Sequence, residues 1–188
     1  MANPRIIAGT ARGIRLNDVP GDITRPITDR VKESLFNILG SDIVDSDFLD
    51  LFGGTGSVGI EALSRGAKFA RFYDLNRPAI STIQKNLVTT HLLEKAEVIQ
   101  RDAFSVLSAS ADRKFDYIYI APPQYKDMWK KAMKLLDVND SWFGIESWII
   151  VQIDPVEYEQ LSLDNIEEFE QRKYGNTVLV FFQKLLDQ

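Results

Sequence analysis

The most informative segment of the sequence is Leu49-Asp50-Leu51-Phe52-Gly53-Gly54-Thr55-Gly56-Ser57-Val58-Gly59. An apolar run leads into a glycine-rich turn, and helix-forming sequence begins at Ser57. Glycines in such a turn let the backbone take positive φ angles and approach a bound ligand closely. The stretch therefore predicts a strand, a ligand-binding turn and a helix, the opening unit of an α/β domain with a largely parallel sheet.

Strand-like and helix-like segments alternate around this turn, joined by short connections. Strands are predicted at 48–51, 69–73, 97–100, 117–120, 148–153 and 177–183. Helices are predicted at 57–65, 78–87, 127–136 and 156–161. Residues 5–17 and the segment around Tyr174-Gly175-Asn176 each predict a β-hairpin. We therefore expect an α/β fold whose mostly parallel sheet ends in an antiparallel strand.

Composition excludes several classes of function. The 188 residues, 45% of them hydrophobic, suit one globular domain. The absence of cysteine and a single histidine, His91, argue against thiolate metal sites and His-dependent triads, so no metal is expected. Because no apolar window reaches the length of a membrane span and the first residues do not resemble a signal peptide, we expect a cytoplasmic protein that does not contact a membrane.

The formal charge of −5 is unevenly distributed. Residues 1–17 carry three arginines and no acid. Residues 137–171 carry ten acids and no lysine or arginine, so the residues outside 137–171 have a net charge of +5. A chain with one acidic pole can still present a phosphate-binding face. Ordinary solvated surface charge is the alternative.

The glycine turn indicates a nucleoside-bearing cofactor. Gly54, Gly56 and Gly59 fit the pattern G-x-G-x-x-G, and Asp74 ends the next predicted strand, where a carboxylate can bind ribose hydroxyls. Asp50 precedes the glycines, where it can meet an ammonium group but would repel a pyrophosphate. This favours S-adenosyl-L-methionine over a nicotinamide dinucleotide.

Asp102, after the third predicted strand, would then lie near the adenine amino group. The alternative is that these acids only cap helices and close turns. The predicted cofactor-binding residues are Asp50, Phe52, Gly53, Gly54, Thr55, Gly56, Asp74, Leu75, Asn76, Asp102 and Ala103.

After the fourth predicted strand comes Ile120-Ala121-Pro122-Pro123-Gln124-Tyr125, which resembles a variant of the D/N-P-P-Y/F motif of amino methyltransferases. Together with residues 5–13, 24–39 and 173–177, it makes nearly the whole chain resemble the RsmD family of ribosomal RNA guanine-N2 methyltransferases. The specific part is Arg25-Pro26-Ile27-Thr28-Asp29-Arg30-Val31-Lys32-Glu33.

The resemblance implies a Rossmann-like class I methyltransferase with a seven-stranded sheet. It implies methylation of the exocyclic N2 of a guanine in 16S ribosomal RNA, within the small ribosomal subunit. We expect a single methyltransferase domain over 1–188, with a hairpin and RNA-facing extension at 1–40 and the core at 41–188. Monomer is the default oligomeric state.

The target motif departs from the family pattern at Ala121 and Gln124. The family's first motif residue accepts a hydrogen bond from the target amine, and its aromatic residue stacks on a base that has left its helix. Alanine supplies no side-chain acceptor, and losing one would cost about 1.5 to 3 kcal/mol, roughly tenfold to a hundredfold in rate. We expect retained activity with the Gln124 amide as substitute, in a pocket formed by Ala121, Pro122, Pro123, Gln124 and Tyr125.

Basic residues before the core are expected to contact RNA phosphate. They and one threonine are Arg5, Arg12, Arg15, Arg25, Thr28, Arg30 and Lys32. Arg25, Thr28 and Arg30 could instead brace the cofactor loop or pair with Asp29 and Glu33. Lys126, Lys130 and Lys134 form a basic stripe on a predicted helix whose apolar face, Trp129, Met133 and Leu136, would meet the core.

Three other functions share parts of this pattern. A catalytically silent RNA-binding or assembly factor would explain Ala121. A DNA adenine-N6 methyltransferase has the same fold logic, but nothing here resembles an added target-recognition domain. A nicotinamide dehydrogenase fits the glycine spacing but not Asp50 or the double proline.

Overall fold

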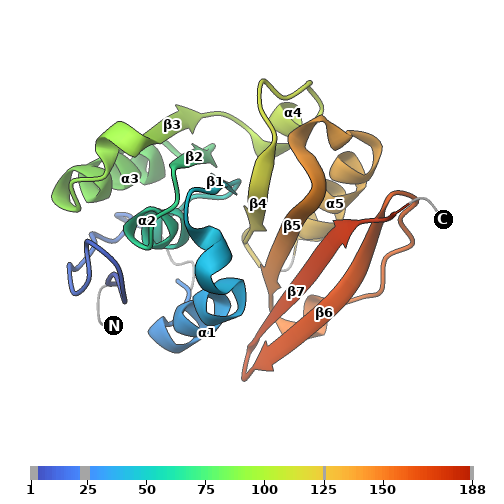
Figure 1. The fold of residues 1–188 in the computed structure, drawn as a ribbon, viewed down its shortest axis with the longest axis horizontal. Helices are drawn as coiled ribbons and strands as arrows, with labels where there is room; N and C mark the ends of the chain where they lie inside the picture. The colour runs from blue at the N-terminus through green and yellow to red at the C-terminus, as the bar shows by residue number, and fades with distance from the viewer. Residues whose placement is uncertain (1–3, 22–25, 125, 187–188) are drawn as a thin grey trace.

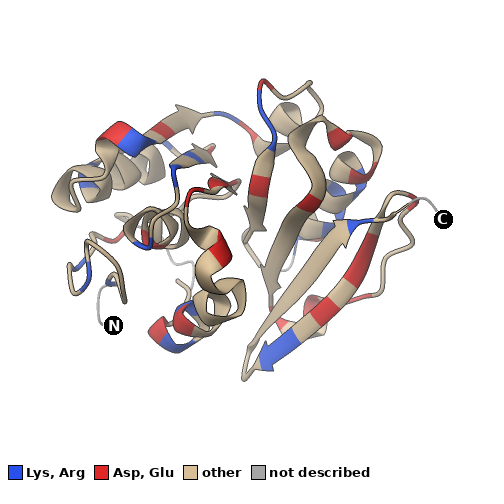
Figure 2. Cartoon of the chain, in the orientation of Figure 1, with Lys and Arg blue, Asp and Glu red and all other residues tan. Residues whose placement is uncertain are grey.

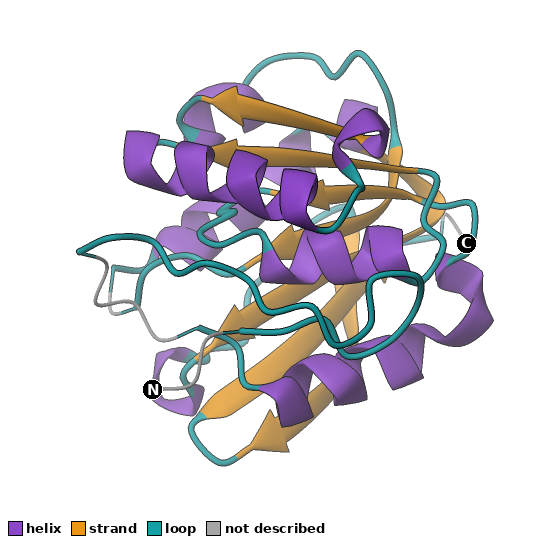
Figure 3. Cartoon of the chain, turned by 90° about the vertical axis from the view of Figure 1, so that its left-hand side faces the viewer, coloured by secondary structure: helices purple, strands orange, loops and turns teal. Residues whose placement is uncertain are grey.

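The computed structural model describes residues 4–21, 26–124 and 126–186, which form an α/β domain with helices on both faces of one sheet (Figures 1 and 3). The strands are β1 (Asp47–Asp50), β2 (Phe69–Asp74), β3 (Ala96–Gln100), β4 (Phe115–Ile120), β5 (Phe143–Ile153), β6 (Ile166–Tyr174) and β7 (Thr177–Lys184). The helices are α1 (Asp29–Leu39), α2 (Ser57–Ser64), α3 (Arg77–Thr89), α4 (Ala103–Leu107) and α5 (Met128–Val138). Short 3-10 turns lie at η1 (Gly40–Ile43), η2 (Leu93–Lys95), η3 (Asp140–Trp142) and η4 (Pro155–Glu157).

The seven strands follow the order β3-β2-β1-β4-β5-β7-β6. Strands β1 to β5 pair in parallel, so their carboxyl ends meet at one edge of the sheet. Strand β7 pairs antiparallel with both β5 and β6, which confirms the predicted antiparallel strand at the end of the chain. The chain order reverses between β1 and β4, and such a switch point is where open α/β sheets bind ligands.

Two buried apolar clusters hold the layers together. Side chains of α1, α2 and α3 pack on one face of the sheet, where Phe36 and Phe48 stack. Side chains of α4 and α5 pack on the other face. The predicted inward face of α5 is confirmed, because Trp129, Met133 and Leu136 are fully buried in this second cluster. The site residues at the sheet edge therefore stand on a rigid support.

The predicted helix over 156–161 is wrong. Only η4 forms there, and the following chain is irregular up to β6. Tyr158, Leu161 and Leu163 pack against the second cluster from this irregular segment, and Asp137 of α5 accepts the backbone N–H groups of residues 164 and 165. A segment this short gains little from helical hydrogen bonds, so tertiary packing decides its conformation.

Helices α1 and α4 are not among the helices predicted from the sequence.

Both predicted hairpins reverse the chain, but with different regularity. Strands β6 and β7 form a regular hairpin whose turn contains Gly175 at a φ of +58°. Residues 5–17 form a loop closed by a single antiparallel bridge between Arg5 and Arg15, without regular strands. The Ile6 N–H donates to the Ile14 carbonyl at 2.9 Å, and the Gly13 N–H donates to the Ile6 carbonyl at 2.8 Å, which supports that bridge. The conformation of residues 5–17 therefore depends on the elements against which this loop packs.

Candidate active site

The carboxyl edge of the sheet brings the predicted cofactor residues together. Asp50 ends β1 and Asp74 ends β2, the neighbouring strand, while Asp102 follows β3 and caps α4. The glycine turn runs from the end of β1 into α2. Residues widely spaced in sequence thus meet at one edge of the sheet, as the sequence predicts.

Asp50 is the most unusual side chain of this edge. It is 1% exposed, and its Oδ1 atom is buried without a hydrogen-bond partner among the residues that the structure describes. Burial raises the pKa of Asp50 to about 8, and the nearby charge of Asp74 raises it further, while the N–H groups of Gly59 and Phe52 lower it. An unpaired buried carboxyl oxygen is costly unless a donor or a cation completes it. The site therefore fits the ammonium group of an amino-acid-bearing cofactor.

The glycine turn is shaped by close approach of the backbone to α3. A Cβ atom on Gly53 would lie 2.7 Å from Cδ1 of Ile83. Gly54 and Gly56 adopt φ angles of +55° and +78°, a region that other L residues rarely use. Gly56 is also the N-cap of α2. These positions require glycine for local reasons, and their N–H groups donate within the protein, to Tyr73, Asp74 and Gly53.

Asp74 holds the turn in place. Its Oδ2 accepts from the N–H of Gly54 at 2.9 Å and its Oδ1 from the N–H of Asn76 at 2.8 Å. Each oxygen retains acceptor capacity, so ribose hydroxyls could still bind there. Leu75 beside it is exposed, which suits an apolar cover over a bound ring.

Asp102 performs the capping role that the sequence left as an alternative. Its Oδ2 accepts from the N–H of Ser105 at 2.8 Å, at the start of α4. Ala103 is buried behind it, and Phe52 contacts Phe104 edge to face with ring centroids 6.2 Å apart. A role of Asp102 toward adenine stays a prediction.

The target motif follows β4 at the same edge. Ala121, Pro122 and Pro123 are half-buried, and Gln124 is exposed. Tyr125 lies outside the described residues. The position of Ala121 directly after β4 places the motif next to Asp50, because β1 and β4 pair with Asp50 opposite Tyr119.

The residues predicted for RNA fall into separate environments. Arg12, Arg15 and Arg30 are exposed, whereas Arg25 lies outside the described residues. Arg5 pairs with Asp29 at 2.7 Å, and Thr28 caps α1 by accepting from the N–H of Val31. In the basic stripe, Lys126 and Lys134 are exposed, but Lys130 pairs with Asp127 and Glu159. Phosphate contacts stay predictions for the exposed members.

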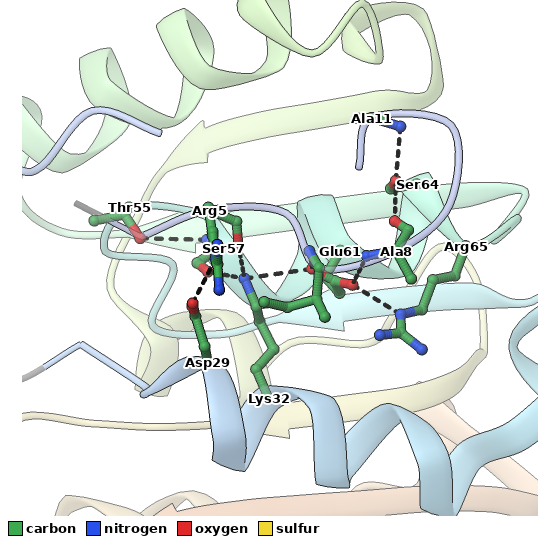
Figure 4. A network of polar contacts seen from close by, with 11 residues as sticks. Arg5, Ala8, Ala11, Asp29, Lys32, Thr55, Ser57, Glu61, Ser64 and Arg65 are labelled. Carbon is green, nitrogen blue, oxygen red and sulfur yellow. Dashed lines mark hydrogen bonds and ion pairs between the residues drawn. The ribbon is translucent and has the colours of Figure 1, made fainter. Parts of the chain in front are cut away.

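The prediction that Lys32 contacts phosphate is wrong. Its side chain is 1% exposed, and its ammonium lies 3.3 Å from the fully buried carboxylate of Glu61 (Figure 4). Glu61 also accepts from the backbone N–H groups of Ile7 and Ala8 and pairs with Arg65. Lys32 therefore braces the structure behind the cofactor turn instead of facing RNA.

Sequence reasoning missed the importance of Glu61 and Asn86. Both are 0% exposed, although their types are usually solvated. A signal existed for Glu61, because it is the only charged residue in the otherwise small or apolar helix SVGIEALS. Asn86 gave no comparable signal, since α3 carries other polar residues along its length.

The described part of the chain offers no group of three His, Cys, Asp or Glu side chains that could hold a metal ion. Within the same residues, no helix has the length and apolar character needed to cross a membrane.

A sheet with this strand order, an antiparallel β7 and a glycine turn with acids at the carboxyl edge defines a Rossmann-like methyltransferase fold. A solved structure described as "Putative methyltransferase yhhF from Escherichia coli" superposes with a TM-score of 0.84 and 31% identity, covering 96% of this chain and 97% of that one.

Sequence comparison identifies the family. The family model described as "Conserved hypothetical protein 95" matches residues 4–183, and the chain belongs to this family, the RsmD family. The Bacillus subtilis "Putative rRNA methyltransferase YlbH" is 36% identical over 96% of this chain and 98% of its own length. The "Ribosomal RNA small subunit methyltransferase D" of Haemophilus influenzae is 38% identical over 80% of this chain and 78% of its own length.

Proposed function

We propose that this protein transfers a methyl group from S-adenosyl-L-methionine to the exocyclic N2 of a guanine in 16S ribosomal RNA. The names of its relatives support the RNA substrate. The observation that carries the proposal is the Oδ1 of buried Asp50, which has no hydrogen-bond partner in the described ranges and belongs to the strand that pairs with β4, directly before Ala121-Pro122-Pro123. We propose further that the domain works in the cytoplasm as a monomer, with residues 1–40 as an RNA-facing extension of the core at 41–188.

The side chains of the edge would divide the work of binding. Asp50 would accept the ammonium of the cofactor, Asp74 its ribose hydroxyls and Asp102 its adenine amino group. When bound, the cofactor supplies an electrophilic methyl on a sulfonium. The backbone carbonyls of Ala121 and Pro122 would accept hydrogen bonds from the target amine and direct its lone pair toward that methyl. No strong general base is required, because the proton can leave after transfer.

The test is methyl transfer from radiolabelled S-adenosyl-L-methionine to small ribosomal subunits that lack modification, with free 16S ribosomal RNA and duplex DNA in parallel. Nucleoside analysis then identifies the product. Label in N2-methylguanine supports the proposal. Label in another nucleoside would correct the target base, and label in N6-methyladenine of DNA alone would favour a DNA methyltransferase.

Ala121 favours a second candidate, a catalytically silent RNA-binding or assembly factor with the same fold. Such a protein would bind ribosomal RNA and the cofactor and transfer no methyl group. Calorimetry with S-adenosylhomocysteine, run beside the transfer assay, separates the two candidates. Binding without transfer to any of the three nucleic acids would support the silent factor.

A further inference from the structure

The N-terminal arm, defined here as residues 4–17, contains no regular strand and lies against α2 and α3. It approaches α2 so closely that a Cβ atom on Gly9 would lie 1.8 Å from the carbonyl oxygen of Ser64. Ser64 Oγ donates to the Ala8 carbonyl and accepts from the Ala11 N–H (Figure 4). The arm therefore takes its position from contacts with the element that begins at the cofactor turn.

One buried bridge connects the start of the arm to that turn. Lys32 Nζ donates to the Arg5 carbonyl at 2.5 Å and to Ser57 Oγ at 2.8 Å (Figure 4). Ser57 directly follows Gly56, and its N–H donates to Thr55 Oγ1 at 3.3 Å. Glu61 compensates the buried ammonium. One cation thus contacts both the arm and the first residue of α2.

A second bridge connects the end of the arm to the same turn. Asn86 Oδ1 accepts from the N–H of Asn17 at 2.7 Å and from its side-chain Nδ2 at 2.9 Å. Asn86 Nδ2 donates to the Asn17 carbonyl at 3.1 Å and to the Thr55 carbonyl at 2.8 Å. Asn86 is fully buried, so losing either set of bonds would leave unsatisfied polar groups.

We propose that Lys32 and Asn86 are positioning residues that couple the N-terminal arm to the cofactor turn. Each divides its hydrogen bonds between the arm and the turn, at residues Ser57 and Thr55 on either side of Gly56. A cofactor that fixes the turn therefore fixes both ends of the arm, which carries the exposed Arg12 and Arg15. Cofactor and RNA then bind with positive coupling, each raising the affinity of the other by the same factor. This inference rests on the proposed function.

The test removes the contacts on the side of the turn and keeps the Lys32–Arg5 bond and the two bonds that Asn17 donates to residue 86 on the side of the arm. Ser57→Ala removes the hydroxyl that Lys32 contacts but keeps the Lys32–Glu61 pair. Asn86→Asp keeps the oxygen that accepts both N–H groups of Asn17, but it replaces the amide donor to the Thr55 carbonyl and to the Asn17 carbonyl by an oxygen. Ser57→Ala is therefore the selective cut, and Asn86→Asp is the second variant. Ser147→Ala is the matched control, because Ser147 is a buried serine of β5. Its Oγ donates to the Phe115 carbonyl and accepts from the Gly144 N–H.

Two measurements are made on each protein. Hydrogen exchange follows the arm amides of Ile6, Leu16 and Asn17 with and without S-adenosylhomocysteine. Calorimetry gives the Kd of S-adenosylhomocysteine with and without a 16S ribosomal RNA transcript. In the parent protein we expect slower arm exchange on binding and a coupling factor of about 5 to 150. In Ser57→Ala and Asn86→Asp the slowing of arm exchange should disappear and the coupling factor should approach 1. Ser147→Ala should keep both effects.

The outcomes separate this inference from the proposed function. No binding of S-adenosylhomocysteine overturns both. Binding with unchanged arm exchange and no effect of RNA overturns the coupling alone. Equal loss of coupling in Ser147→Ala also overturns it, because general destabilisation would then explain the result. If Asn86→Asp does not fold, Ser57→Ala decides the matter by the same two measurements.

Discussion

At the scale of single residues, Asp50 shows how burial prepares a group for a ligand. Its carboxyl is enclosed between the end of β1 and the start of α2, and its Oδ1 has no hydrogen-bond partner within the described part of the chain. Keeping such a group costs stability, which proteins tolerate mainly where a ligand completes the bonding. Lys32 is the opposite case, because Glu61, Ser57 and Arg5 satisfy its buried ammonium within the protein.

Asp50 should make both stability and cofactor affinity depend on pH. Because its pKa is raised from 3.8 to about 8 in the folded state, the folded protein holds a proton that the unfolded chain releases. The free energy of unfolding should therefore fall as pH rises from about 4 to about 8, and Asp50→Asn should remove that part of the slope. Urea unfolding of both proteins at several pH values measures the difference.

Cofactor affinity should change with pH in the opposite direction, because only the ionised Asp50 attracts an ammonium group. We expect affinity for S-adenosylhomocysteine to rise from about pH 6 to about pH 8. Asp50→Asn should weaken binding by about tenfold or more and abolish the rise. Equal affinity of the two proteins by calorimetry across this range would disprove the assignment of Asp50.

The target motif gives a second prediction at this scale. Ala121→Asn restores a side-chain acceptor directly after β4 and should raise kcat by about tenfold to a hundredfold. Gln124→Ala should lower kcat if the exposed amide serves as the substitute acceptor. Single-turnover methyl transfer measures both, and unchanged turnover in Gln124→Ala would contradict the role of Gln124 as the substitute acceptor.

At the scale of elements, α2 is the piece that joins the turn to the sheet. A Cβ atom on Gly59 would lie 2.3 Å from Cε1 of Phe72 in β2, so the backbone of the helix packs directly against the Phe72 ring. Gly59→Ala should therefore lower the free energy of unfolding by about 1 to 3 kcal/mol, despite the better helix propensity of alanine.

The matched control is Gly144→Ala in β5, where the added Cβ would only reach ordinary contact, 3.7 Å from Ser147 Oγ. Thermal and urea unfolding of the two variants give the comparison. A Gly59→Ala protein as stable as Gly144→Ala would contradict the close packing of α2 on β2.

At the scale of the whole molecule, β6 carries a group of acidic residues, and the N-terminal arm carries exposed arginines. Figure 2 shows acidic residues along much of β6, at one edge of the sheet, whereas the arm carries exposed arginines far from that strand. A net negative protein can therefore still bind RNA through its arm, because phosphate binding depends on local charge.

Charge reversal tests this distribution. Arg12→Glu combined with Arg15→Glu should lower RNA affinity and reduce the steepness of its salt dependence by about two phosphate contacts. Lys68→Glu with Lys95→Glu is the control pair, since both lysines are exposed near the amino ends of β2 and β3. Filter binding over a range of salt concentrations gives both slopes, and equal slopes for the two pairs would count against an RNA-facing arm.

The strand–turn–helix unit, the mostly parallel sheet and the gathering of Asp50, Asp74 and Asp102 at one edge were all predictable from the amino-acid sequence. These follow from local rules: hydrophobic periodicity sets each element, and parallel strands place their carboxyl ends together. Those rules do not predict the irregular chain after η4, because packing against the cluster that includes α5 determines its conformation.

The roles of Lys32, Glu61 and Asn86, by contrast, depend on contacts between distant parts of the chain. Lys32 belongs to a basic, polar segment that reads as solvent-facing, yet it is enclosed by groups 25 and 27 residues away in sequence. Asn86 meets the arm across 69 residues. No local pattern encodes such contacts, because burial of a polar side chain depends on which distant segments pack around it and satisfy its hydrogen bonds.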